Sequence, residues 1–134
     1  MNANIRLVAG ILVGATVFYI LDLTSKYLPG GIGPGIHLAS IVLAPIITVM
    51  ISKTSRNRSI MASSVAYLVY VVPTDISGYA IRGMQFFPNL SAYSFVTQVT
   101  AIVSGIIFGA LVAGAVGLIS YKLLATRRSE IRVA

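Results

Sequence analysis

The sequence predicts an all-α integral membrane protein, an up-down bundle of four transmembrane helices in a single domain that covers residues 1–134. First, the chain is 57% hydrophobic and 10% charged, with a mean hydropathy of +0.91, whereas soluble domains are about 25% charged. Second, several apolar runs approach the roughly 20 residues that cross a bilayer. Third, the cations lie at the ends of these runs, as expected for a multi-pass protein of the cell membrane.

The first predicted helix covers residues 6–27, which at about 1.5 Å per residue span about 30 Å, the thickness of the hydrocarbon core. Gly10 and Gly14 form a GxxxG pattern, which favours close packing against another helix. Near the outer end of this helix, Asp22 and Lys26 are one turn apart. Their acid-before-base order suits an ion pair at the water interface.

Proline and glycine set the predicted boundaries of the second and third helices. Residues 28–35 (LPGGIGPG) contain so many Gly and Pro that we expect a turn there, followed by a helix over residues 36–52. A third helix is expected over residues 60–81. Pro45 and Pro73 lie inside these helices, and because proline lacks a backbone donor each is expected to kink its helix. Such a kink can line a cavity, although proline is also simply commoner in membrane helices than in soluble ones.

A short amphipathic helix is expected at the membrane interface between the third and fourth transmembrane helices. Apolar and small residues recur at helical spacing from Ile76 to Phe87, and Arg82 would then point towards water. Pro88 would end this segment.

The fourth helix, expected over residues 91–124, has the most regular pattern in the chain. Small residues recur at every fourth position, namely Ala101, Gly105, Gly109, Ala113 and Gly117. Helices in lipid associate through close contact of small residues. We therefore expect Gly10 and Gly14 to pack against this stripe, and the rest of the stripe to face another protein.

The charges predict that both termini are cytoplasmic. With four crossings and a cytoplasmic N-terminus, eight Lys and Arg residues lie inside and two, Lys26 and Arg82, lie outside. On the inner side we expect contacts with lipid headgroups from Lys53, Arg56, Arg58, Lys122, Arg127 and Arg128. The net charge of +7 then reflects orientation in the membrane, and we expect no nucleic-acid partner.

The polar residues at the predicted outer end are the candidate site of this sequence, and they are Asp22, Lys26, His37, Asp75 and Arg82. Ionisable residues within membranes are candidates for function. Two acids balanced by two bases are equally suited to ion pairs that only hold the loops at the interface. The balance of charges in the cluster favours this structural interpretation.

We expect no enzymatic activity, no metal site and no cofactor. The chain has no cysteine and one histidine, which excludes thiolate chemistry, Cys-ligated clusters and bis-histidine haem ligation within one chain. Three acids and one histidine offer no set of nucleophile, base and orienting group. Tyr67 and Tyr70 lie on one helical face, and their hydroxyls need hydrogen-bond acceptors. These acceptors can belong to the protein itself, or the two tyrosines can form a site for a quinone headgroup.

Two functions fit these features. The first is a non-catalytic integral-membrane subunit or structural membrane protein that packs into a larger assembly through small-residue helix faces. Its partners would be membrane lipids and either other membrane-protein subunits or further copies of itself. The second is a small membrane transport or substrate-binding subunit with a pocket near the outer face. A filled bundle interior would favour the first function, and a polar cavity within the membrane would favour the second.

Overall fold

The computed structural model describes residues 2–28, 32–82 and 95–133. These residues form four α-helices and no strand; the helices are α1 (Ala3–Tyr27), α2 (Ile32–Ser52), α3 (Arg56–Arg82) and α4 (Phe95–Val133). Within the described residues, α1, α2 and α4 are the three helices that are long and apolar enough to cross a membrane. The described part of the protein is therefore all-α, with an architecture that fits a membrane.

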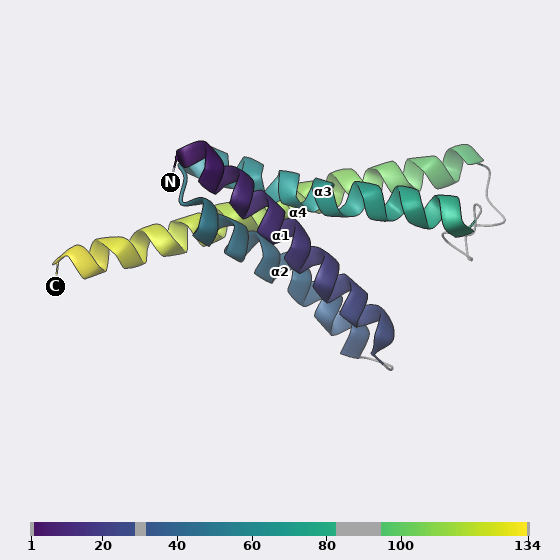
Figure 1. The fold of residues 1–134 in the computed structure, drawn as a ribbon, viewed down its shortest axis with the longest axis horizontal. Coiled ribbons are helices and arrows are strands. Elements are labelled where there is room, and N and C mark those ends of the chain that lie inside the picture. Colours follow the sequence, from purple (N-terminus) through teal and green to yellow (C-terminus); the bar gives the residue numbers. More distant parts are fainter. Residues whose placement is uncertain (1, 29–31, 83–94, 134) are drawn as a thin grey trace.

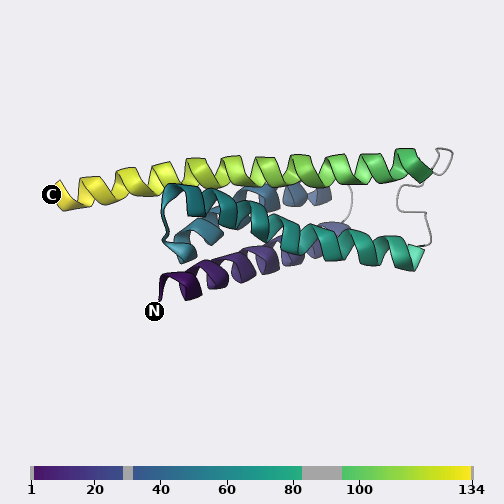
Figure 2. The same cartoon turned by 90° about the horizontal axis from the view of Figure 1, so that it is seen from above.

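The helices form two hairpins that diverge from each other. α1 pairs with α2 in the first hairpin, and α3 pairs with α4 in the second. The hairpins meet at the end that holds the N-terminus and the α2–α3 connection, and they separate towards the other end (Figure 1). Viewed from above, α4 extends beyond the other helices at the C-terminus (Figure 2). We call the first region the packed end and the second the open end.

Small side chains allow the helices to approach closely at the packed end. A Cβ atom added at Gly10 would lie 2.8 Å from the backbone oxygen of Thr48, and one added at Gly14 would collide with the Thr48 side chain. Alanines from three helices, Ala44, Ala62, Ala66 and Ala113, are 0% exposed at the centre of this contact. α1 therefore packs on α2 and α3 through its glycines. Our expectation that Gly10 and Gly14 pack on α4 is wrong, because α3 occupies the α4 surface instead.

The stripe on α4 faces α3 over only part of its length. Side chains added at Gly109 and Gly117 would collide with Tyr67 and Ser63 of α3, so these positions form the second hairpin. Nearby, the Ser64 hydroxyl donates to the Ala110 carbonyl at 2.9 Å and joins the two helices. Towards the open end, by contrast, Gly105 has no atom within 4 Å of an added Cβ. Ala101 is exposed as well.

Several helix boundaries differ from those expected. α3 begins at Arg56 instead of residue 60, and α4 continues to Val133 instead of ending at residue 124. α2 begins at Ile32, inside the stretch predicted to be a turn, because Pro34 lies in the first helical turn, where no backbone donor is needed. Gly33 lets this start approach α1, since an added Cβ would lie 2.6 Å from the Ser25 oxygen. α3 continues through Pro73 to Arg82. The predicted interfacial helix therefore overlaps the end of α3, and its residues 83–87 lie outside the described part of the chain.

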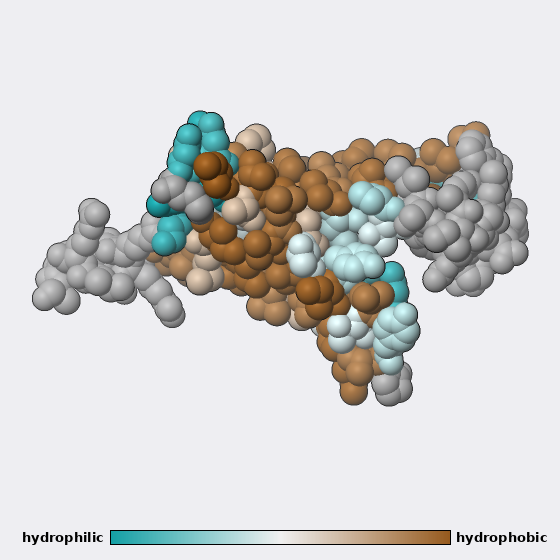
Figure 3. All heavy atoms as spheres, in the orientation of Figure 1, coloured by the Kyte–Doolittle hydropathy of each residue, from teal (hydrophilic) through white to brown (hydrophobic). Residues whose placement is uncertain are grey.

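The cations that we expect at lipid headgroups lie at the packed end and along the C-terminal part of α4. Lys53, Arg56, Arg58 and Lys122 are exposed. Arg127 and Arg128 belong to the last turns of α4, and their side chains lie outside the described part. Hydrophilic atoms gather near the N-terminus, whereas hydrophobic atoms cover the middle of the molecule (Figure 3).

The close contact at Gly10 predicts that Gly10→Ala lowers the thermal unfolding midpoint in detergent. The added methyl would press on a backbone oxygen that cannot move alone, and overpacking costs roughly 1–3 kcal/mol. Gly105→Ala is the matched control, because its methyl group would lie in open space. In addition, alanine is more favourable than glycine in a helix by about 1 kcal/mol. We expect an unchanged or higher midpoint for this control. Equal midpoints for both variants would contradict the close contact.

Candidate functional site

A cavity of about 410 Å³ opens between the two hairpins, and all four helices line it. Paler, more polar atoms lie in the angle between the hairpins, in contrast to the hydrophobic surface around them (Figure 3). The lining residues are Phe18, Asp22, Lys26, His37, Ser40, Ile41, Tyr67, Tyr70, Val71, Thr74, Asp75, Gly105 and Ile106.

Asp22 is the centre of the polar contacts on the first hairpin. The residue is only 7% exposed, and its carboxylate accepts from two side chains. Lys26 Nζ lies 2.7 Å from Oδ2, one turn along α1, and His37 Nδ1 of α2 lies 3.2 Å from Oδ1. The Tyr70 side chain of α3 lines the same cavity. One buried charge thus links α1 to α2.

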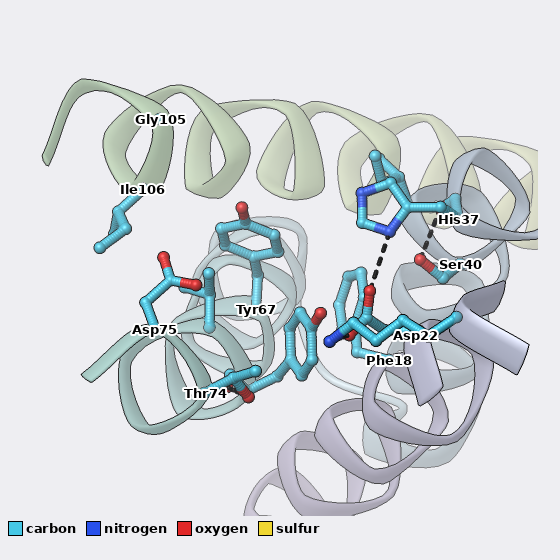
Figure 4. A pocket seen from close by; sticks show the side chains of 13 residues that line it. Phe18, Asp22, His37, Ser40, Tyr67, Thr74, Asp75, Gly105 and Ile106 are labelled. Carbon is cyan, nitrogen blue, oxygen red and sulfur yellow. Dashed lines mark hydrogen bonds and ion pairs between the residues drawn. The ribbon is translucent and has the colours of Figure 1, made fainter. Parts of the chain in front are cut away.

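The contact with Asp22 determines which ring nitrogen of His37 remains available in the cavity. An ionised carboxylate only accepts hydrogen bonds, so His37 donates through Nδ1. This leaves the Nε2 atom available to a ligand or to water, and the His37 side chain is half-exposed. The Ser40 hydroxyl donates to the His37 backbone carbonyl at 2.6 Å and does not contact the ring (Figure 4).

Asp75 lies on the second hairpin, across the cavity from Asp22 (Figure 4). It makes no hydrogen bond or ion pair with the residues that the structure describes. The charged groups that interact electrostatically with the Asp75 carboxylate are Asp22 and Lys26. The two carboxylates therefore differ, since Asp22 is fully engaged within the protein and Asp75 faces the cavity.

Three aromatic rings line the same cavity as the two carboxylates. Phe18 of α1 and Tyr70 of α3 stack at a centroid distance of 5.5 Å with an angle of 12° between their planes. Tyr67 stands edge-on to both, 5.5 Å from Phe18 and 6.2 Å from Tyr70. Such stacked and perpendicular pairs are the preferred geometries of aromatic rings. The cluster joins the two hairpins next to the point where they separate.

The structure brings together four of the five residues of the predicted outer cluster. Asp22, Lys26, His37 and Asp75 line one cavity, while Arg82 ends α3 and its side chain lies outside the described part. Gly105, predicted only as a packing residue, also lines the cavity.

Six lining residues were not identified from the sequence, namely Phe18, Ser40, Ile41, Val71, Thr74 and Ile106. Helical spacing could have found some of them, because Phe18 lies four residues from Asp22 and Ser40 lies three residues from His37. The missing information was which helix faces meet.

The site holds two side chains of metal-ligating type in contact, Asp22 and His37. In the part of the chain that the structure describes, no group of three or more such side chains gathers. Comparison of the chain with protein-family models, with curated proteins and with solved structures finds no match. The site must therefore be interpreted from its own chemistry.

The contacts of Asp22 predict that Asp22→Asn destabilises the protein by about 1–2 kcal/mol, since two charge-assisted hydrogen bonds are weakened together. Lys26→Gln should cost less, because Lys26 is half-exposed and His37 still contacts the carboxylate. Thermal unfolding of both variants in detergent tests this order. A larger loss for Lys26→Gln would show that the contact with His37 contributes little.

Proposed function

We propose that this chain is a small, non-catalytic membrane protein that binds a solute in the cavity between its hairpins, as a transport or substrate-binding subunit. The observation that carries the proposal is a cavity of about 410 Å³ with charged and polar walls inside apolar helices. Ligand pockets are typically about 300–1,000 Å³. Ionisable residues at membrane depth are costly, so they are usually retained for a function.

The charge distribution supports an entrance on the outer side. The exposed cations Lys53, Arg56 and Arg58 lie at the packed end, which the positive-inside rule assigns to the cytoplasm. The cavity lies towards the open end, where the hairpins separate. In this orientation, which requires α3 to cross the membrane as well, a solute would enter from outside.

The contacts in the cavity support binding in preference to catalysis. Asp22 and His37 form an acid-histidine pair, which in hydrolases orients a histidine towards a nucleophile. Here the Ser40 hydroxyl donates to a backbone carbonyl instead of contacting the His37 ring. The Asp22–His37 pair is therefore suited to hold a ligand or water. Its imidazole ring has no hydrogen bond to the Ser40 hydroxyl that would make Ser40 a nucleophile.

A second candidate function is that of a subunit in a larger membrane assembly. It is favoured by one observation, namely that Ala101 of the stripe remains exposed after α3 and α4 have packed. Small residues exposed on a membrane helix can bring another helix close. The partner would be another membrane-protein subunit or a second copy of this chain, and the two functions are compatible.

Thiol labelling tests the proposed cavity, because the native chain has no cysteine. We expect Gly105→Cys in proteoliposomes to react with a water-soluble cationic thiosulfonate, since Gly105 lines the cavity and has space for a side chain. Ala113→Cys, on the same helix but 0% exposed, is the matched control and should not react. If neither variant reacts, the cavity is closed to water and the proposed function is wrong.

The subunit hypothesis predicts that Ala101→Leu weakens association in mild detergent. Ala115→Leu makes the same change at an exposed position of α4 outside the stripe, and it should leave association unchanged. Size-exclusion chromatography with light scattering measures the difference. A wild-type protein that is monomeric and carries no stoichiometric protein partner would remove this hypothesis.

A further inference from the structure

Within the proposed binding function, we infer that the ligand is an organic cation whose ammonium group lies between the Asp75 carboxylate and the aromatic rings of Tyr67 and Tyr70. The inference rests on three features of the described residues. These are the charged groups of the cavity, the ring surfaces on its wall and the absence of a protein partner for Asp75 among the described residues.

The first feature is charge. Lys26 compensates Asp22 at 2.7 Å, and His37 donates to the same carboxylate. Asp75 adds a second carboxylate to a lining in which Lys26 is the one lysine or arginine. A carboxylate in an apolar setting is costly without a counterion, so the cavity favours a ligand that supplies a positive charge.

The opposing charges in the cavity do not remove this preference. Lys26 is about half-exposed, which lets its ammonium group lie towards water, and it is held by Asp22 on the first hairpin. Asp75 is on the second hairpin, across the cavity. A cation beside Asp75 is therefore separated from Lys26 by the cavity itself, whereas an anion near Lys26 would compete with Asp22.

The second feature is the aromatic wall. The faces of aromatic rings carry partial negative charge and attract cations within about 6 Å, more strongly where water is excluded. Tyr67 and Tyr70 both line the cavity, and their ring centroids lie 6.2 Å apart at an angle of 65°. Phe18 stacks on one face of Tyr70, so the other face is the one available to a cation. Asp75 is on the same helix, one to two turns further on, and lines the same cavity.

The size of the cavity restricts the ligand to a small molecule. A volume of about 410 Å³ exceeds that of an ammonium headgroup alone, and Val71 and Ile106 supply apolar lining beside the rings. An ammonium headgroup that carries a short apolar chain satisfies the charge and the apolar wall together.

Three probes of similar size and different charge test the inference on the full chain in neutral dodecyl maltoside micelles. The probes are choline, the neutral 3,3-dimethylbutan-1-ol and the anionic 3,3-dimethylbutanoate, and calorimetric titration measures their affinities. We expect choline to bind at least about tenfold more tightly than the alcohol, and the anion to bind most weakly. This comparison needs no variant, so it stands even if a variant fails to fold.

Asp75→Asn should lower the affinity for choline to that for the alcohol and leave the affinity for the alcohol unchanged. Asp75→Glu keeps the charge and should keep the preference for choline. Glu130→Gln makes the same acid-to-amide change in the last turns of α4, and it should change neither affinity. An unchanged affinity of Asp75→Asn for choline would overturn the assignment of Asp75.

The outcomes separate this inference from the function on which it rests. Equal binding of choline and the alcohol would overturn the cation assignment while leaving a solute-binding cavity. Tighter binding of the anion would do the same. Absence of binding for all three probes would overturn the cation assignment, whereas the proposed function is tested separately by the reactivity of Gly105→Cys.

Discussion

The size of the side chains between the helices is the constraint on which the rest of the structure depends. Lipid gives apolar helices no hydrophobic reason to associate, so close contact between small residues holds them together. Gly10 and Gly14 bring α1 onto α2, and Gly117 brings α4 onto α3. Where larger side chains such as Phe18 and Tyr67 enter the contact, the hairpins diverge. The cavity thus begins where the small residues of α1 and α3 are followed by these rings.

The same gradient in side-chain size positions the polar groups. Phe18 and Asp22 are one turn apart on α1, and Tyr70 and Thr74 are one turn apart on α3, so each helix passes from an aromatic contact to a polar wall. The aromatic cluster lies on the side of the cavity that faces the packed end, and the two carboxylates lie nearer the open end. Asp22 is held by Lys26 and His37, which keeps its charge within the protein. Asp75 lacks such partners among the described residues and is the group best placed to act on a ligand.

Local features of the chain were predictable from the sequence, and contacts between helices were only partly so. The Asp22–Lys26 pair follows from spacing within one helix. The start of α2 was misjudged because Gly33 and Pro34 are typical of turns, although both are compatible with a first helical turn. The partner of Gly10 could not be predicted, since the stripe on α4 and the Thr48 surface of α2 offer similar small contacts. The cavity depends on that choice of partners.

Hydroxyl-radical footprinting of the unmodified protein in lipid nanodiscs tests the central claim most directly, because it measures which side chains contact water. We predict oxidation of Tyr67 and Tyr70, which line the cavity. We predict little oxidation of Phe108, which is 69% exposed on the apolar outer surface of α4 and would face lipid. Equal protection of the two tyrosines and Phe108 would contradict a hydrated cavity between the hairpins.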